Sequence, residues 1–279
     1  MSESNQPSAA LYIVATPIGN LADMTGRAIE VLKSVDLIAA EDTRHSGRLL
    51  QHFGIGTRMM SYHDFSEDSR VESLLQKLSS GMSVALISDA GTPLISDPGY
   101  RLVVRARAAG ITVVPVPGVC ALTTALSVAG LPSDRFVFEG FVPAKRAARI
   151  KQFEEWLAES RTLIFYESPH RILECVEDLL TVFGPDRQVV LCRELTKTFE
   201  TIHGDTLANL LPWMQSDSNQ QRGEFVVLIK GAEVVQSEEV SAEALRVLEI
   251  LLEELSVKQA ASLAARITGV KKNLLYQRA

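Results

Sequence analysis

The stretch Leu86-Ile-Ser-Asp-Ala-Gly-Thr-Pro-Leu-Ile-Ser-Asp-Pro-Gly99 decides the fold, because a short apolar run ends there in a long polar loop. Residues 84–87 are apolar on both faces, which is typical of a buried parallel strand. Open α/β sheets bind ligands outside the carboxyl ends of such strands. The loop is longer than the roughly two to six residues usual between a strand and a helix. We therefore expect a ligand loop, with a pair of solvated turns as the alternative.

Strand-like and helix-like patterns alternate on both sides of this loop. The predicted strands of the first half are residues 11–15, 37–40, 58–63, 84–87 and 111–115. Helical spacing separates them, which predicts βαβ units and a mainly parallel sheet. A tight Pro117-Gly118 turn then leads small residues into a helix, so that a ligand could approach the backbone amides there.

The second half of the chain restarts the alternation. Strands are predicted at residues 135–141, 162–166, 188–192 and 224–229, and helices at 145–158, 172–180 and 207–211. Polar loops at 167–171 and 193–200 follow two of these strands. The predicted fold class is therefore α/β, with two α/β domains at 11–117 and 118–231.

The ends of the chain have a different character. Residues 1–10 are predicted to be a disordered N-terminus and 232–240 an acidic linker. From 241 to 279 the pattern is purely helical, with helix-turn-helix spacing and a possible capping box at Ser256–Gln259. By spacing alone, a small helical cap is at least as good an interpretation of this segment. Its basic residues favour nucleic acid modestly.

The composition limits the classes of function and the cellular location that this chain is expected to have. The 279 residues include 46% hydrophobic residues and have a formal net charge of -6, which argues against non-specific nucleic-acid binding by the whole surface. Local basic patches remain at Lys145, Arg146, Arg149 and Lys151, and in residues 256–279, which contain no acid. No apolar run is long enough for a membrane span, and residues 1–9 do not resemble a signal peptide, so a cytoplasmic location is the default.

Familiar cofactor and metal motifs are absent. The sequence contains no G-x-G-x-x-G after a strand, no phosphate-binding P-loop, no H-E-x-x-H and no G-x-S-x-G. Its three cysteines and scattered histidines predict neither a disulfide framework nor a metal site. The strand-end loops, rich in small and apolar residues, suit a bulky neutral or zwitterionic cofactor.

Five ordered motifs carry a family resemblance. They are Thr16-Pro-Ile-Gly-Asn-Leu21, Ala40-Glu-Asp-Thr-Arg44, Ser88 to Gly99, Pro117-Gly-Val119 and Phe165-Tyr-Glu-Ser-Pro-His-Arg171. Together they resemble the S-adenosylmethionine-dependent tetrapyrrole methylase-like family. Within it, they resemble most closely the branch that methylates the ribose 2′-hydroxyl of a cytidine in small-subunit ribosomal RNA.

This resemblance implies a fold, a cofactor and partners. It implies two α/β domains with S-adenosylmethionine in the cleft between them, a homodimer, and ribosomal RNA or the small ribosomal subunit as substrate. The cofactor contacts that it implies are Ile18, Asp89, Ala90, Gly91, Thr92, Ile95, Cys120, Ala121, Tyr166, Glu167 and Leu195. The tetrapyrrole enzymes have Gly-Asp-Pro where this chain has Gly91-Thr92-Pro93, so Asp89 is expected to act nearby instead.

Methyl transfer to a ribose needs alignment and a group that takes the hydroxyl proton or stabilises the alkoxide. Arg44 and Lys197 are the preferred candidates, with Asp42 and Glu200 as further ones; for each cation a structural salt bridge is the alternative. The predicted RNA contacts are Arg44, Lys145, Arg146, Arg171, Arg193, Lys271 and Lys272. A small-molecule methylase and a non-enzymatic RNA-binding assembly factor are the competing hypotheses. The basic tail and Thr92 favour ribosomal RNA over a tetrapyrrole.

Overall fold

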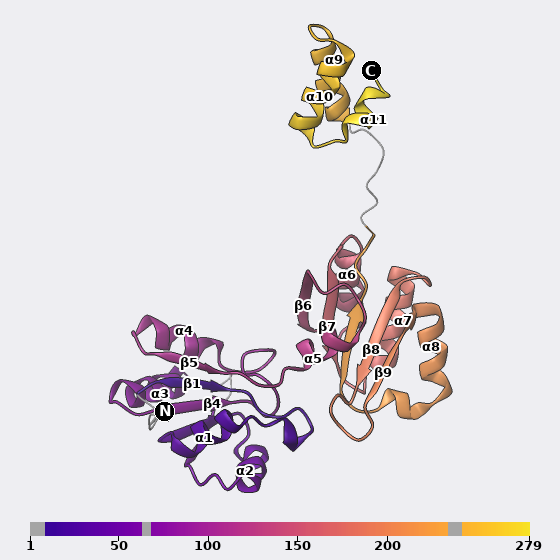
Figure 1. Cartoon of the computed structure of the whole chain (residues 1–279). Helices are drawn as coiled ribbons and strands as arrows, with labels where there is room; N and C mark the ends of the chain where they lie inside the picture. Colours follow the sequence, from indigo (N-terminus) through magenta and orange to yellow (C-terminus); the bar gives the residue numbers. More distant parts are fainter. Residues whose placement is uncertain (1–8, 63–67, 234–241) are drawn as a thin grey trace. The chain divides into compact units, whose positions relative to one another are not determined.

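The computed structural model describes residues 9–62, 68–233 and 242–279 (Figure 1). The chain divides into two compact units, Met1–Ala232 and Glu233–Ala279. The first contains two five-stranded sheets, and the second contains helices only. None of the helices in the described ranges has the length and apolar character that a bilayer crossing needs. The α/β class and the helical C-terminal segment are confirmed, whereas the exact domain boundaries stay a prediction.

The first sheet is wholly parallel, as predicted. Its order is β3-β2-β4-β1-β5, formed by β1 (Leu11–Val14), β2 (Leu37–Ala40), β3 (Met59–Ser61), β4 (Val84–Ile87) and β5 (Val113–Val116). The helices that follow the first four strands are α1 (Gly26–Ser34), α2 (Thr43–His52), α3 (Asp68–Ser79) and α4 (Tyr100–Ala108). All four residues of the central β4 are buried, which explains its unbroken apolar run.

The second sheet is mixed, unlike the first. Its order is β6-β7-β10-β8-β9, and only β6 and β7 are parallel. The strands are β6 (Phe136–Phe141), β7 (Thr162–Glu167), β8 (Gln188–Arg193), β9 (Thr201–Thr206) and β10 (Phe225–Ile229). Strand β9 was not predicted, and it follows β8 as an antiparallel neighbour. The alternation of strands and helices in this half therefore does not produce a parallel sheet.

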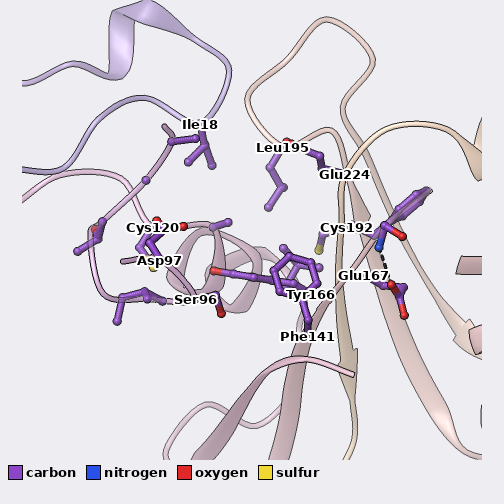
Figure 2. A pocket seen from close by; sticks show the side chains of 18 of the residues that line it. Ile18, Ser96, Asp97, Cys120, Phe141, Tyr166, Glu167, Cys192, Leu195 and Glu224 are labelled. Carbon is purple, nitrogen blue, oxygen red and sulfur yellow. Dashed lines mark hydrogen bonds between the residues drawn. The ribbon is translucent and has the colours of Figure 1, made fainter. Parts of the chain in front are cut away.

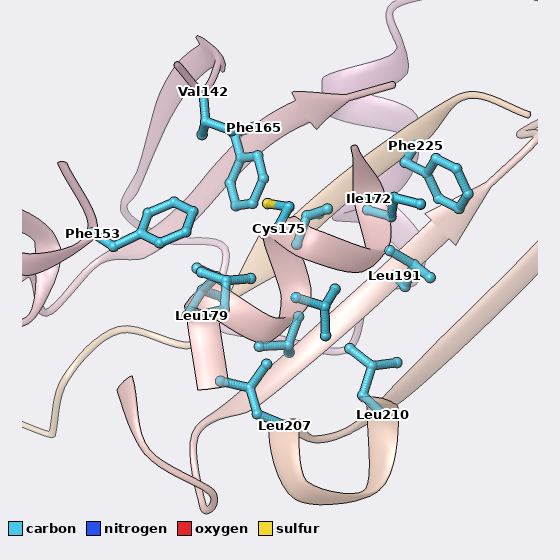
Figure 3. Close-up of a cluster of buried hydrophobic side chains, with 14 of the residues drawn as sticks. Val142, Phe153, Phe165, Ile172, Cys175, Leu179, Leu191, Leu207, Leu210 and Phe225 are labelled. Atoms are coloured by element: carbon cyan, nitrogen blue, oxygen red, sulfur yellow. The ribbon is translucent and has the colours of Figure 1, made fainter. Parts of the chain in front are cut away.

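Each face of the second sheet has its own core. On one face lie α6 (Arg146–Trp156), α7 (Ile172–Phe183) and α8 (Leu207–Ser216), and Figure 3 shows Phe153, Phe165 and Leu179 among the side chains packed there. The other face buries Ile164, Val190 and Leu228 against α5 (Ala121–Val128). Helix α5, which follows the last strand of the first sheet, thus belongs to the core of the second.

Other differences concern element boundaries and the termini. Helix α2 begins at Thr43, inside the loop predicted at 41–47, because the Asp42 side chain accepts a hydrogen bond from Arg44 N at 2.8 Å and caps the helix. Most of the predicted disordered segment 1–10 and of the linker 232–240 lies outside the described residues. Ala10, which is described, is buried.

The C-terminal unit has a small core of its own. It consists of α9 (Ala242–Leu252), α10 (Val257–Thr268) and α11 (Lys272–Tyr276), which bury mainly alanine and leucine side chains. The predicted capping box is only partly formed, since the Ser256 hydroxyl donates to the Gln259 side-chain oxygen at 2.8 Å and makes no cap to the backbone.

Candidate active site

A cavity of about 360 Å³ lies among the strand-end loops of the two sheets (Figure 2). Ten of the eleven residues predicted to contact the cofactor line it: Ile18, Ala90, Gly91, Thr92, Ile95, Cys120, Ala121, Tyr166, Glu167 and Leu195. Asp89 is the exception. It lies beside α2, where its carboxylate accepts from Asp42 N at 3.0 Å. The structure therefore gathers residues that are up to 177 positions apart (18 to 195) around one cavity.

Hydrogen bonds join the loops of the first sheet at the cavity. Thr16 and Gly91 exchange two backbone hydrogen bonds, at 2.8 and 2.9 Å, as an isolated antiparallel bridge. The Thr92 hydroxyl donates to the Val119 carbonyl at 2.9 Å. The loops after β1, β4 and β5 are thus held as one wall, and Thr92 ties two of them together.

Two glycines in this wall are required, Gly91 by its backbone conformation and Gly118 by its surroundings. Gly91 has a φ of +82°, which other residues rarely adopt, and a Cβ added there would meet the Ile18 side chain at 3.5 Å. A Cβ added to Gly118 would lie only 2.8 Å from Ala15 Cβ. The glycines therefore allow the backbones to approach closely and keep the cavity open at Gly91.

The two central apolar residues of the loop at 88–99 pack in different hydrophobic cores. Leu94, at a φ of +76°, packs with the first sheet and lies against Gly99, whereas Ile95 packs with the second sheet's cavity-side core. Ser96 also has a positive φ, of 64°. This strained path brings Ile95, Ser96 and Asp97 to the cavity.

Tyr166 connects the second sheet to helix α5. Its hydroxyl accepts a hydrogen bond from Leu122 N at 3.0 Å, in the first turn of that helix. Its ring packs edge-on against Phe138 and Phe141, with centroids 4.9 and 5.6 Å away. Burial raises the pKa of Tyr166 well above its ordinary value, so the phenol stays protonated.

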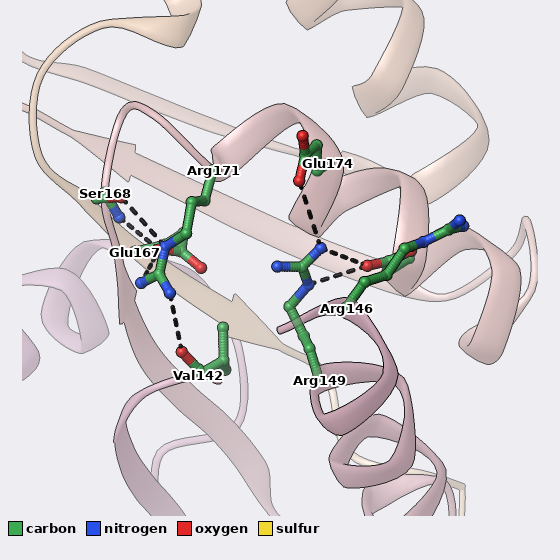
Figure 4. Close-up of polar contacts among 8 residues, drawn as sticks. Val142, Arg146, Arg149, Glu167, Ser168, Arg171 and Glu174 are labelled. Carbon is green, nitrogen blue, oxygen red and sulfur yellow. Dashed lines mark hydrogen bonds and ion pairs between the residues drawn. The ribbon is translucent and has the colours of Figure 1, made fainter. Parts of the chain in front are cut away.

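Glu167 borders the cavity, but its carboxylate is bound on the helix-covered side of the sheet (Figure 4). It accepts from Ser168 N at 2.7 Å and pairs with Arg171 at 2.6 Å, and its side chain is fully buried. The same arginine donates to the Ser168 hydroxyl and the Val142 carbonyl. Arg171, predicted to contact RNA, is thus engaged within the fold.

Asp97, which was not among the predicted cofactor contacts, also lines the cavity. Burial raises its pKa to about 6, and the nearby carboxylates of Glu41 and Asp89 act in the same direction, while a hydrogen bond with Ser88 opposes them.

Further lining residues that were not predicted are Ser96, Phe141, Ser168, Pro169, Cys192, Glu224, Phe225 and Val226. Ser96 and Ser168 directly follow a predicted residue, and that adjacency is the signal that could have found them.

The four predicted catalytic residues are not among those that line the cavity. The Arg44 side chain is 92% exposed and lies 3.6 Å from Asp42. Lys197 Nζ lies 2.8 Å from Glu194 Oε1 and 2.9 Å from Glu224 Oε2. Glu200 accepts from Thr196 N at 2.6 Å. For Lys197 the structure supports the salt-bridge alternative.

The predicted RNA contacts fall into two groups. Lys145, Arg146, Lys271 and Lys272 are exposed, although Arg146 also pairs with the buried Asp178 at 2.8 Å. Arg149 completes that buried ion cluster, 2.6 Å from Asp178. Figure 4 shows Arg149 together with its second partner, Glu174. The structure does not support the predicted RNA contact of Arg193. This residue is only 8% exposed, and its guanidinium donates to the Phe199 and Arg222 carbonyls, so it stabilises its own loop and is not available to RNA.

The cavity fits a large, partly apolar cofactor. Its volume is within the range of about 300–1,000 Å³ common for small-molecule sites. Ile18, Ile95 and Leu195 provide apolar surface of the kind that an adenine ring contacts, and Gly91 provides close access to the backbone. The described residues contain no group of three potential metal-ligating side chains. S-adenosylmethionine, a sulfonium with an adenosine and an amino-acid part, matches this chemistry.

Comparisons with known proteins agree with this geometry. The family model for tetrapyrrole (corrin/porphyrin) methylases matches residues 10–211, and a model described as the RsmI C-terminal HTH domain matches residues 238–279. "Ribosomal RNA small subunit methyltransferase I" of Pseudomonas aeruginosa PAO1 is 60% identical, covering 98% of this chain and 97% of the relative. The protein of that name from Escherichia coli O157:H7 is 59% identical, covering 96% and 93%.

A solved structure shows the same fold at much lower identity. Diphthine synthase superposes with a TM-score of 0.60 at 16% identity, covering 79% of this chain and 90% of the other. Since the family model spans most of the two-sheet unit, and since its strand-end motifs form the walls of one cavity, this chain belongs to the tetrapyrrole (corrin/porphyrin) methylase family.

Proposed function

We propose that this chain transfers a methyl group from S-adenosylmethionine to the ribose 2′-hydroxyl of a cytidine in small-subunit ribosomal RNA. The observation that carries the RNA substrate is the near-complete coverage, helical tail included, by relatives of 59% and 60% identity that are named ribosomal RNA small subunit methyltransferases. The ribose and the cytidine are the finer part of the proposal and rest on the motif resemblance given above.

S-adenosylmethionine is the methyl donor of this family, and it supplies an electrophilic methyl group on a positively charged sulfur. The residues that would hold it are those of the cavity. Gly91 and Thr92 would receive its amino-acid part, Cys120 and Ala121 would lie against its middle, and Leu195 would cover the adenosine. The apolar lining excludes water, which strengthens the electrostatic interactions at the reacting atoms.

The RNA would be held by exposed cations outside the cavity. Arg44 projects from the first turn of α2, Lys145 and Arg146 lie at the start of α6, and Lys271 and Lys272 lie at the start of α11. Such side chains contact phosphates and set the position of a nucleic acid, whereas base contacts provide specificity. A homodimer and a cytoplasmic location belong to the proposal as well.

Methyl transfer by the purified full chain tests the proposal. The chain is incubated with isotopically labelled S-adenosylmethionine and either assembled small subunits or deproteinised ribosomal RNA, and the RNA is digested to nucleosides for mass spectrometry. We expect label in 2′-O-methylcytidine. Label on a nucleobase, or no label in either RNA substrate, contradicts the proposal.

A further inference from the structure

Methylation of a hydroxyl releases a proton, and a group at the cavity must accept it. The carboxylates among the described lining residues are Asp97, Glu167 and Glu224. Glu167 is bound by Arg171 and Ser168 N on the helix-covered side of the sheet. Glu224 is bound by Lys197, and its side chain is 79% exposed. Each of these two carboxylates is therefore already paired with a cation of the fold.

Two further titratable groups of the lining, Tyr166 and Cys192, are protonated. Burial raises the pKa of Tyr166, and it raises the pKa of Cys192 to about 12. Both side chains are thus neutral near pH 7. A neutral phenol or thiol is a weak base, so neither is suited to accept the proton. Asp97 is left as the described lining carboxylate for which no ion pair with a lysine or arginine is observed.

The charged and polar groups around Asp97 come from several elements. Glu41 follows β2 and Asp89 follows β4, and both repel its negative charge. The Ser88 hydroxyl stabilises the charge by hydrogen bonding. From the second sheet, Tyr166 lines the same cavity as Asp97, and so does Cys120, which precedes α5. Asp97 thus shares the cavity with residues of both sheets.

We propose that Asp97 is the general base that accepts the proton of the attacking ribose 2′-hydroxyl, an inference that rests on the proposed function. The ribose oxygen forms a bond to the methyl carbon while the carbon–sulfur bond breaks. The electron pair of that bond remains on sulfur, which becomes a neutral thioether. The hydroxyl proton passes to the Asp97 carboxylate, and the resulting carboxylic acid later releases it to solvent.

The environment of Asp97 suits this task. A base is most effective when its pKa lies near the working pH, and the pKa of about 6 leaves Asp97 ionised at neutral pH but more basic than an exposed aspartate. The neighbouring carboxylates favour the protonated product of the step. The strained backbone at Leu94 and Ser96 fixes the loop that presents this side chain.

The test compares wild type with Asp97→Asn, which keeps the shape and removes the base. Single-turnover methylation of ribosomal RNA is measured at saturating S-adenosylmethionine from pH 5 to 8.5, and cofactor affinity is measured separately by calorimetry. The wild-type rate should rise with pH and level off above about 6. The variant should lose about 10²–10⁴-fold in rate, and it should lose the inflection while binding the cofactor within about threefold of wild type.

Asp134→Asn is the matched control, because Asp134 is an exposed loop residue and does not line the cavity. It should keep the wild-type rate and pH profile. If Asp97→Asn is recovered unfolded, Asp97→Glu takes its place; a lower rate with a displaced inflection supports the inference, and an unchanged profile overturns it.

Each remaining outcome is decisive. An Asp97→Asn variant with wild-type rate and inflection overturns the inference. So does a variant that binds S-adenosylmethionine weakly but reaches the wild-type rate at saturation, because Asp97 would then bind the cofactor ammonium instead. If the wild-type chain methylates no ribose at all, the proposed function is wrong and the inference about Asp97 is wrong with it. This outcome differs from the first two, in which the wild-type chain is active.

Discussion

The side chain of Lys197 lies directly on the backbone of Gly19. A Cβ added to Gly19 would collide with Lys197 Cγ and lie 2.9 Å from its Cε. The Lys197 ammonium is held in turn by Glu194 and Glu224. Gly19 follows the cavity residue Ile18, so this contact joins loops of the two sheets at the edge of the cavity. We call Gly19, Lys197, Glu194 and Glu224 the lysine clamp.

The clamp predicts that Gly19→Ala weakens cofactor binding. The new methyl group must displace the Lys197 stem, and the φ of +152° at position 19 is also unfavourable for alanine. Overpacking of about 1–3 kcal/mol corresponds to an increase of roughly 5–150-fold in the dissociation constant of S-adenosylmethionine if the bound state bears the whole cost. Calorimetry checks this. Gly26→Ala is the control, because nothing lies within 4 Å of its added Cβ.

The variant Lys197→Met tests whether the Lys197 side chain holds the two loops together or takes part in methyl transfer. Methionine keeps an apolar stem over Gly19 and loses both ion pairs, so cofactor affinity should fall by only about fivefold, and by more in Lys197→Ala. The rate at saturating S-adenosylmethionine should stay within about threefold in both variants. A hundredfold loss of that rate in Lys197→Met would instead mean that the ammonium contacts the reacting groups.

Gly91→Leu should abolish cofactor binding, because the side chain would enter the cavity beside Ile18. Gly110→Leu provides the matched control: Gly110 has a φ of +73°, close to that of Gly91, but nothing lies within 4 Å of its added Cβ and it does not line the cavity. Both variants bear similar backbone strain, so only the first should lose binding in calorimetry. Equal affinities would remove Gly91 from the cofactor site.

Asp97 makes stability depend on pH. Its pKa is about 6 in the folded chain against 3.8 ordinarily, so the folded state binds more protons than the unfolded state between these values. This contribution is fully present below pH about 4 and is lost as the pH rises through about 6. In urea titrations, Asp97→Asn should therefore become progressively more stable relative to wild type from pH 4 to 7. A difference that does not change with pH would show that Asp97 is not buried as described.

The double variant Lys271→Ala/Lys272→Ala should weaken RNA binding and leave S-adenosylmethionine binding unchanged. Two lost phosphate contacts should reduce the slope of log K against log salt by about 1.4 for single-stranded RNA. Fluorescence anisotropy at several salt concentrations measures the slope. Lys33→Ala/Arg107→Ala removes the same charge from exposed positions of the first sheet's helices and should change the slope little. An equal change in both double variants would mean that the tail has no special role.

The cavity wall could be predicted from sequence where strand ends and turn residues coincide. Gly91, Thr92 and Cys120 each follow an apolar strand in a glycine- or proline-containing loop, and such loops meet at one edge of a parallel sheet. The side chains that complete the site depend on the tertiary fold. Lys197 and Glu224 are 27 residues apart, and nothing in the sequence pairs them.

The strand order of the second sheet could not be predicted from the sequence either. Strand β9 contains Gly204 and alternates exposed with half-buried residues at the sheet edge, so its apolar signal is weak. Strand β10 inserts between β7 and β8, although β8 and β9 precede it in the chain. Local patterns report which residues are buried, but they do not report which strands become neighbours.

Mapping of 2′-O-methylated nucleosides in small-subunit ribosomal RNA, from cells with and without this gene, tests the central claim most directly. Loss of the gene should remove a single 2′-O-methylcytidine, and the wild-type chain should restore it where Gly91→Leu does not. An identical ribose methylation map in both strains would contradict the account.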